Sequence, residues 1–224
     1  MTRRLTVLLL TAAALIMLVV AVGRQGALAG GDKDLTIGPI PTVTSPSGKV
    51  ESAVFAGGCF WCVEPPFDKV DGVLATTVGY TGGPEKNPTY KDVSWGRTGH
   101  TEAIHVQFDP EKVTYQQLLE VFWRTMDPTD VGGQFVDRGS QYRPGIFFAN
   151  DAQKVAAQAS KKALSESGRF SKPIIVPIQA AETFYPAENY HQDFYKKDPG
   201  TYYRYRKGSG RDAFINKHWP EQAK

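Results

Sequence analysis

The stretch 57–64, Gly-Gly-Cys-Phe-Trp-Cys-Val-Glu, determines how the rest of this 224-residue chain is interpreted, and it holds the only two cysteines, Cys59 and Cys62. An apolar run at 53–56 precedes it and predicts a short buried strand. The two glycines permit a tight turn after that strand. The residues that follow, through Val70, have helical spacing, and the proline pair at 65–66 predicts a helix that is irregular or starts late. Cys59 is therefore expected where a strand passes into a helix.

This position favours an ionised Cys59. Backbone N–H groups at a helix start stabilise negative charge, and a cysteine there has a lowered pKa and is present more as the nucleophilic thiolate. In an exported protein, two cysteines are also typical of a structural disulfide. A loop as short as 59–62 gains little stability from closure, however, so the close spacing points to a redox pair.

Two other uses of the cysteine pair have less support. A structural zinc site needs four ligands, but the chain has no second pair of cysteines and its four histidines are scattered. A thioredoxin-like dithiol also has a tryptophan near its cysteines, but there it precedes them, whereas here Phe60 and Trp61 lie between them. Two large apolar side chains beside a nucleophile indicate a pocket for an apolar group.

Residues 1–29 have the pattern of a targeting segment. Arg3 and Arg4 come first, an apolar run of 18 residues follows at 5–22, and the Ala-Leu-Ala sequence at 27–29 offers a cleavage site. The pattern predicts a secretory signal peptide. The apolar run is also just long enough to span a bilayer, so an uncleaved N-terminal anchor stays open. The protein is accordingly expected in the periplasm or another extracytoplasmic space, either free or anchored.

Residues 30–50 are rich in Gly, Pro, Ser and Thr and predict a flexible linker. The remainder, 51–224, is enough chain for one domain with its own core. Residues 1–29 carry three arginines and no acidic residue, so the formal charge falls from +3 to 0 without them. The folded part therefore has no charge excess that would indicate binding to nucleic acid, and membrane contact is expected only through the N-terminal segment.

Helices and strands are predicted to alternate loosely after the motif. Strands are expected at 73–80, 101–108, 146–148 and 174–178, the last at an edge or end because of its prolines. Helices are expected after Thr114 and over 151–167, a long polar loop at 127–140, and a basic, aromatic tail at 200–224 that packs over the core. The expected fold class is α+β (or α/β): a two-layer sandwich of one mixed sheet and helices, with a ferredoxin-like core.

The strand at 101–108 places a carboxyl group in an unusual position. Its residues alternate, so that Glu102 shares a face with the apolar Ile104, Val106 and Phe108. The carboxyl is therefore expected to point inward, which is rare for glutamate. A buried carboxyl either pairs with a cation such as an arginine or keeps its proton near neutral pH.

The sequence around the cysteines resembles the signature of the peptide methionine sulfoxide reductase A family. The resemblance starts with Gly-Gly-Cys-Phe-Trp at 57–61 and continues through further blocks at 79–83, 87–90, 99–102, 137–143 and 184–192. Each block alone is weak, but together they cover roughly residues 51–197 in the family's order and spacing, which makes the resemblance specific.

The resemblance implies a role for each of several side chains. Cys59 matches the nucleophile that attacks the sulfoxide sulfur, and Glu102 matches the acid that protonates the departing oxygen. Tyr90 and Tyr142 match the two tyrosines that hydrogen-bond this oxygen. Phe60 and Trp61 match the aromatic cage around the S-methyl group, and Asp137 matches an acid that positions substrate or water. Without the resemblance, these tyrosines are more often core residues than oxygen ligands, and Trp61 is explained as a core residue; His191 is interpreted as structural.

The chain departs from many family members at Cys62, where they have glycine and carry resolving cysteines near the C-terminus. Here no cysteine follows position 62. The hypothesis is that sulfoxide attack leaves a sulfenic acid on Cys59, which condenses with Cys62 to a disulfide. An external dithiol protein would then reduce this disulfide, with dithiothreitol as a substitute in vitro and no bound cofactor. Outside the cytosol this donor would be an exported thioredoxin-like protein.

The sequence thus predicts a peptide-methionine (S)-S-oxide reductase that repairs oxidised free or protein-bound methionine, the S epimer being implied by the resemblance. One alternative is a general thiol–disulfide oxidoreductase, which would use the cysteine pair without needing Glu102. A second is a secreted binding domain with a small structural disulfide.

Overall fold

The computed structural model describes residues 39–220, so the predicted targeting segment 1–29 lies outside the described residues. The strands are β1 (Glu51–Ala56), β2 (Val73–Thr81), β3 (Thr101–Phe108), β4 (Gly133–Gln134), β5 (Asp137–Arg138), β6 (Gly145–Phe148), β7 (Ile178–Ala180) and β8 (Tyr185–Pro186). The helices are α1 (Phe60–Asp68), α2 (Tyr90–Ser94), α3 (Tyr115–Trp123), the 3-10 turn η1 (Ser140–Tyr142), α4 (Asp151–Glu166), α5 (Phe194–Lys197), α6 (Pro199–Gly208) and α7 (Arg211–His218).

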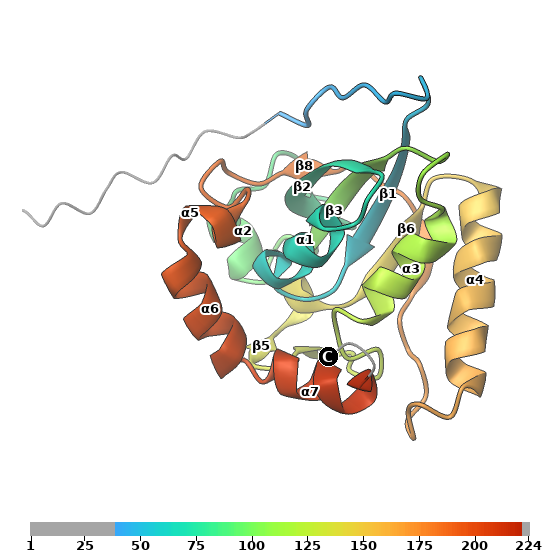
Figure 1. Ribbon diagram of the computed structural model, residues 1–224. Helices are drawn as coiled ribbons and strands as arrows, with labels where there is room; N and C mark the ends of the chain where they lie inside the picture. The colour runs from blue at the N-terminus through green and yellow to red at the C-terminus, as the bar shows by residue number, and fades with distance from the viewer. Residues whose placement is uncertain (1–38, 221–224) are drawn as a thin grey trace, which may run out of the picture. The chain divides into compact units, whose positions relative to one another are not determined.

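The main sheet has the strand order β7-β6-β1-β3-β2-β8 (Figure 1). Pairing is antiparallel between β6, β1, β3 and β2, and parallel between β6 and β7, so the sheet is mixed. Helix α1 joins β1 to β2 across β3, and α3 lies on the connection from β3 to β6 across β1. These two split β-α-β units form a ferredoxin-like core, which confirms the predicted fold class.

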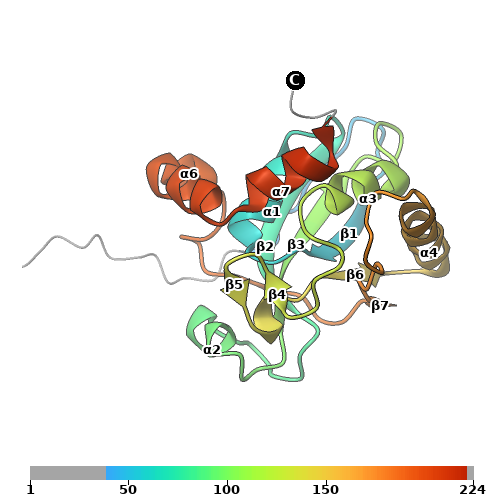
Figure 2. The same ribbon diagram turned by 90° about the horizontal axis from the view of Figure 1, so that it is seen from below.

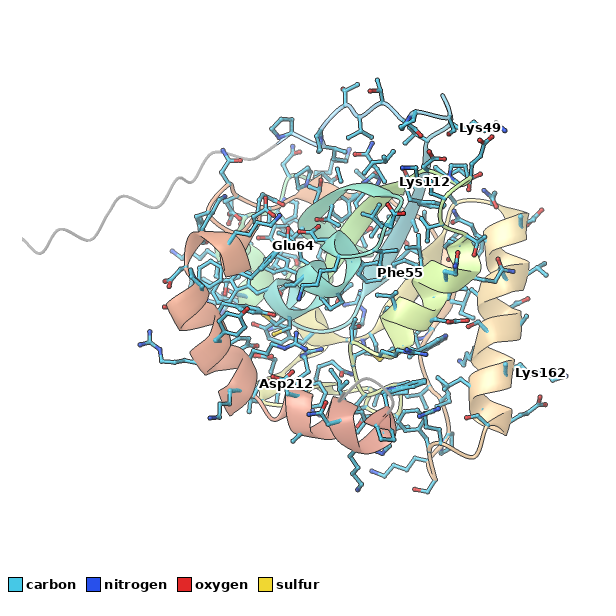
Figure 3. All side chains as sticks on the ribbon, viewed as in Figure 1. Lys49, Phe55, Glu64, Lys112, Lys162 and Asp212 are labelled. Atoms are coloured by element: carbon cyan, nitrogen blue, oxygen red, sulfur yellow. The ribbon has the colours of Figure 1, made fainter. Side chains whose placement is uncertain are left out.

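Helices α1 and α3 lie on the same face of the sheet (Figure 2) and enclose the main core with it. The ring of Phe55, labelled in Figure 3, stacks with those of Phe67, Tyr115 and Phe122 at centroid distances of 5.3, 5.9 and 5.1 Å. Replacing a fully buried phenylalanine with alanine costs about 3–5 kcal/mol. This cluster therefore fixes Phe55 near the end of β1, and with it the position of Cys59, which follows Phe55 by four residues.

Helix α1 starts at Phe60 without delay and contains both Pro65 and Pro66, so the expectation of a late start was wrong. A proline inside a helix has no N–H to donate to the carbonyl four residues earlier. For Pro66 that carbonyl belongs to Cys62, and the guanidinium of Arg206 donates to it instead, at 3.1 Å. A tertiary contact thus replaces the missing helical hydrogen bond.

Three other expectations differ from the structure. The predicted strand at 174–178 is displaced to β7, because Pro173 and Pro177 cannot donate to a sheet ladder. Its apolar pattern reflects burial without pairing, since Ile174 and Val176 lie in the main core. The polar loop at 127–140 contains the small hairpin β4–β5, and the tail forms the helices α6 and α7.

The described part of the predicted linker, residues 39–50, contains no helix or strand. The hydroxyls of Ser45 and Ser47 both donate to the carboxylate of Asp109, the latter at 2.7 Å. Within residues 39–220, no helix is long and apolar enough to cross a membrane.

Candidate active site

The junction between β1 and α1 brings both cysteines to one place. Gly58 has a φ of +83°, and a Cβ on it would lie 2.5 Å from Cβ of Gln134, so only glycine fits. Cys59 follows as the N-cap of α1, and Cys62 is in the first turn of the helix. Both are free thiols, buried, and joined by a side-chain hydrogen bond. The predicted position of Cys59 between a strand and a helix is confirmed.

The two thiols differ in how readily they ionise. Burial raises the pKa of Cys59 well above 9.0, and its hydrogen bond to Cys62 and the nearby Glu102 act in the same direction. The hydrogen bond from Cys59 lowers the pKa of Cys62 to about 7, against the effect of burial and with the help of Arg211 and Arg206. The expected lowering of the Cys59 pKa was therefore wrong for the free protein. The N–H of Phe60, at the helix start, is directed to Glu102 instead.

Glu102 begins the buried face of β3 and is 2% exposed, which confirms that its carboxyl points inward. Its Oε2 accepts the backbone N–H of Phe60 at 3.0 Å. Burial raises the pKa of Glu102 to about 8; the Phe60 N–H opposes this, and Asp137 and Cys62 add to it. No salt bridge within residues 39–220 involves Glu102. The side chain is therefore mainly a neutral acid at pH 7, next to a thiol.

Tyr90 and Tyr142 face this acid from two separate turns, the first residue of α2 and the last of η1. Burial raises the pKa of each phenol, and the charge of Glu102 is the next cause in both cases. The phenols therefore keep their protons and can act as hydrogen-bond donors. Both are half-buried, as expected for groups that line a site rather than fill a core.

Hydrogen bonds hold these two turns in place. The carboxylate of Glu188 accepts the backbone N–H of Tyr90 at 2.8 Å and the hydroxyl of Tyr80 at 2.9 Å. The side chain of Gln141 donates to the carbonyl of Ser94 at the end of α2, at 2.9 Å, and thereby links η1 to α2. The block at 184–192 thus acts by positioning Tyr90, a role that the sequence did not assign to Glu188.

Phe60 and Trp61 form an aromatic wall beside Cys59. Phe60 is buried, with its ring centroid 4.9 Å from that of His191. Trp61 stacks on Phe194 at 3.8 Å and donates its Nε1–H to Nδ1 of His191 at 3.0 Å. Because Nδ1 accepts this bond, His191 orients the indole ring, which is consistent with the structural role that the sequence suggested.

Asp137 approaches the thiols from β5. Burial raises its pKa, while a hydrogen bond from Tyr205 and the charge of Arg211 lower it. The hydroxyl of Tyr205 donates to Asp137 and also interacts with Cys59. Tyr205 comes from α6, in the tail that the sequence assigned only to packing, and no local pattern there marks it as a site residue.

The structure therefore brings together all the residues that the sequence selected, namely Cys59, Phe60, Trp61, Cys62, Tyr90, Glu102, Asp137 and Tyr142. It adds Tyr80, Glu188, Tyr205, Arg206 and Arg211. Within residues 39–220, no group of three or more His, Cys, Asp or Glu side chains is arranged to hold a metal ion. The arrangement defines a thiol-based enzyme in which a nucleophilic sulfur is paired with a neutral carboxylic acid and two phenol donors.

Known proteins are similar in sequence to this chain over most of its length. The model of the peptide methionine sulfoxide reductase family matches residues 51–223. The MsrA protein of Listeria monocytogenes is 58% identical over 170 residues, covering 76% of this chain and 96% of the relative. That of Bacillus subtilis is 56% identical over 173 residues, covering 77% and 98%. The chain belongs to the peptide methionine sulfoxide reductase family.

Solved structures of two relatives have the same fold. Mxr1 from Saccharomyces cerevisiae in its reduced form matches with a TM-score of 0.63 and 32% identity, over 70% of this chain and 90% of that one. Methionine sulfoxide reductase A of Corynebacterium diphtheriae matches with a TM-score of 0.59 and 29% identity, over 75% and 90%.

Proposed function

We propose that this chain reduces methionine sulfoxide, free or in peptides, to methionine, and that it acts on the S epimer. The observation that carries the proposal is the pairing of Cys59 with Glu102, a buried acid whose pKa of about 8 keeps it protonated at neutral pH. Sulfoxide reduction needs a sulfur nucleophile and a proton for the departing oxygen, and this pair supplies both.

In the proposed first step, Sγ of Cys59 attacks the sulfoxide sulfur while Glu102 delivers its proton to the oxygen. Tyr90 and Tyr142 donate hydrogen bonds to that oxygen as negative charge develops on it. The S–O bond of the sulfoxide then breaks, and its protonated oxygen passes to Cys59 as the transient bond between the two sulfurs breaks. The products are methionine and a sulfenic acid on Cys59. Phe60 and Trp61 provide the apolar surface for the S-methyl group.

In the proposed second step, Cys62 resolves the sulfenic acid. Its sulfur attacks Sγ of Cys59, the S–O bond breaks, and water leaves. Cys62 is the only other cysteine of the chain, and it already lies within hydrogen-bonding distance of Cys59. A thioredoxin-like dithiol protein then reduces the disulfide. Should residues 1–29 export the protein, as their pattern predicts, this donor must also be extracytoplasmic, and the enzyme would repair proteins exposed there.

The general thiol–disulfide oxidoreductase is less well supported. Thiol–disulfide exchange requires neither a neutral glutamic acid nor two phenols facing the thiol, yet three separate elements of this fold supply them. A binding domain with a structural disulfide would not need that arrangement either.

A single-turnover experiment tests the proposal. The reduced protein without residues 1–29, freed of reductant, is mixed with one equivalent of a methionine-S-sulfoxide peptide, and the masses of both are recorded. Reduced peptide together with loss of two hydrogens from the protein supports both steps. Reduced peptide with one oxygen gained by the protein supports the reductase and removes Cys62 as the resolving residue. An unchanged peptide contradicts the proposed activity. The matched R-sulfoxide peptide, which should stay oxidised, tests the epimer.

A further inference from the structure

The C-terminal segment, defined here as residues 199–218, reaches the two thiols from the far end of the chain. It comprises α6 and α7, and Arg206 of α6 contacts α1 at the carbonyl of Cys62. Three of its side chains, Tyr205, Arg206 and Arg211, act on the cysteines. Two of the three are cations, and the proposed function has given neither of them a task.

Arg206 is bound to the helix that carries Cys62. Its Nη1 donates to the carbonyl of Cys62, the group that Pro66 leaves without a helical donor. Its Nε donates to Asp212 at 2.7 Å, and Nη1 also contacts the hydroxyl of Tyr202 at 3.2 Å. The guanidinium is thus held at the backbone of Cys62 by partners on both α6 and α7.

Arg211 is fully buried, at 0% exposure, and is the largest such side chain in the described residues. Its Nη1 donates to the carbonyls of Gly57 and Thr125, and its guanidinium lies over the ring of Phe135. Within residues 39–220 it forms no salt bridge, and its Nε and Nη2 have no hydrogen-bond partner.

A buried cation that forms no salt bridge is unfavourable, because burial removes its hydration without replacing it. The two carbonyl oxygens accept hydrogen bonds from Nη1 of Arg211, but they do not neutralise the positive charge of its guanidinium. Its placement beside Gly57 and Gly58, the residues that lead into the cysteine motif, therefore requires a negative charge nearby. Two ionisable groups feel the charge of Arg211, namely Asp137 and Cys62, and Cys62 is the one on which Arg206 acts as well.

We propose that Arg211 and Arg206 are positioning residues that hold Cys62 as a thiolate in the reduced enzyme, and that this thiolate accepts the proton of Cys59 when Cys59 attacks the sulfoxide. This inference rests on the proposed function. It gives Cys62 a role in the first step, before it resolves the sulfenic acid, and it explains how a buried Cys59 whose own environment disfavours ionisation becomes a nucleophile.

The steps balance in atoms and electrons. The proton of Cys59 moves along the existing hydrogen bond to Cys62, and the proton of Glu102 moves to the sulfoxide oxygen. Methionine leaves, and Cys59 is oxidised to the sulfenic acid. Cys62, now a thiol, attacks Sγ of Cys59, so that an S–S bond forms and the S–O bond breaks. The hydroxide leaves with the Cys62 proton as water, and Glu102 regains a proton from solvent.

Charged and titratable groups from every neighbouring element act on Cys62. They are Cys59 at the start of α1, Glu102 of β3, Asp137 of β5, Tyr202 and Arg206 of α6, and Arg211 of α7. Two further groups act through these: Tyr205 on Cys59, and Asp212 on Arg206. The acidic groups oppose a thiolate, and the two guanidinium groups and the Cys59 thiol favour it. The lowered pKa of Cys62 agrees with this balance.

The first test is a titration of the reduced protein, followed by the ultraviolet absorbance of the thiolate. Wild type should show one step near neutral pH. Cys59→Ser, whose hydroxyl still donates, should keep that step, and Cys62→Ser should lose it. Arg211→Met should raise its midpoint by about one unit or more, the size expected for the loss of a close opposite charge. Arg206→Met should raise it less.

Arg204→Met is the matched control, because Arg204 carries the same charge on the same helix but is exposed and donates only to Thr201. Its titration should match wild type. Arg211→Lys keeps the charge, so its midpoint should lie much closer to the wild-type value than that of Arg211→Met. Should Arg211→Met fail to fold, Arg206→Met carries the same test. A neutral-pH step that stays in Cys62→Ser, or a midpoint unchanged in both arginine variants, overturns the proposal.

The second test follows methionine formation in a single turnover at pH 7. Without its proton acceptor, Cys62→Ser should form methionine about tenfold or more slowly than wild type. A resolving role alone predicts an unchanged first step, so equal rates would overturn the inference while leaving the proposed function intact. If wild type itself forms no methionine, the proposed function fails instead, and the two failures are thereby distinguished.

Discussion

Two glutamates of this protein are alike in burial, in backbone hydrogen bonding and in pKa, but they have different neighbouring side chains. Glu64 of α1 and Glu102 of β3 are 1% and 2% exposed. Each accepts one backbone N–H, from Asp193 at 3.1 Å and from Phe60 at 3.0 Å respectively. Burial raises the pKa of both to about 8. Glu64 is labelled in Figure 3.

The groups around the two carboxyls are what differ. Glu64 faces Asp68, Asp193 and Lys196, which connect α1 to α5 by salt bridges. Glu102 faces two thiols, four phenols and Asp137. Only the second environment contains a thiol that can act as a nucleophile, together with half-buried phenol donors.

The comparison shows that a raised pKa identifies a buried acid and not a catalytic one. Desolvation is the first cause in both cases, and it acts wherever a carboxyl is removed from water. Function requires that other reactive groups converge on the acid. Glu64 and Glu102 therefore serve as matched controls for each other.

The largest expected effect is on the activity of Glu102→Gln. The amide keeps the size and the contact with Phe60 but has no acidic proton, so kcat for sulfoxide reduction should fall about 10²–10⁴-fold at pH 7. Steady-state kinetics with dithiothreitol measure this. Glu64→Gln, at an acid of the same pKa, should stay within about twofold of wild type.

The protonation state of Glu102 also predicts how the rate changes with pH. Glu102 acts in its protonated form, so the wild-type rate should fall as pH rises through about 8. That descending limb should disappear from the residual activity of Glu102→Gln and persist in Glu64→Gln. A limb that survives in Glu102→Gln would assign the acid to another residue.

The sequence could predict Glu102 because its signal is local. Alternation along one strand places it on the apolar face, and a strand exposes that pattern within eight residues. The same kind of signal existed for Glu64, which stands with Phe60, Val63 and Phe67 at helical spacing. The proline pair obscured it, because it suggested that no regular helix would form there.

The role of the C-terminal segment could not be predicted in this way. Arg206 contacts Cys62 across 144 positions and Arg211 contacts Gly57 across 154. Nothing near either arginine indicates a thiol, and each contact depends on how α6 and α7 pack against α1. The same holds for the segment 174–178. Its apolar residues correctly predicted burial, but they did not predict that the strand starts only at Ile178.

A smaller effect on kcat is expected when a phenol hydroxyl is removed near Glu102 and, as a comparison, near Glu64. Tyr142→Phe removes one donor near Glu102, and kcat should fall about 10–100-fold because the developing charge on oxygen loses a hydrogen bond. Tyr195→Phe is the control. The hydroxyl of Tyr195 donates to the carboxylate of Asp68 at 2.7 Å, and Asp68 is a neighbour of Glu64. This control variant should change kcat less than about twofold. Equal losses in both variants would mean that Tyr142 acts through folding alone.

The smallest expected effect on activity, at Glu64, comes with a change in stability. The folded pKa of about 8 lies above the ordinary value of 4.5, so the folded state holds this proton more tightly than the unfolded state does. The resulting stabilisation is complete below pH 4.5 and is lost as pH rises toward about 8. Glutamine cannot ionise, so Glu64→Gln should become more stable than wild type over this range, by about 2–4 kcal/mol at its upper end.

Urea unfolding at several pH values measures this difference. Below pH 4.5 the two proteins should agree within about 1 kcal/mol, because Glu64 is then neutral in both states. Glu102→Gln should gain stability over the same range, since its acid has the same pKa and the same first cause. Stability should therefore respond alike to both substitutions, and activity to only one. A parallel loss of activity in Glu64→Gln would mean that the two acids belong to one coupled site, because the surroundings that separate them would then have no functional consequence.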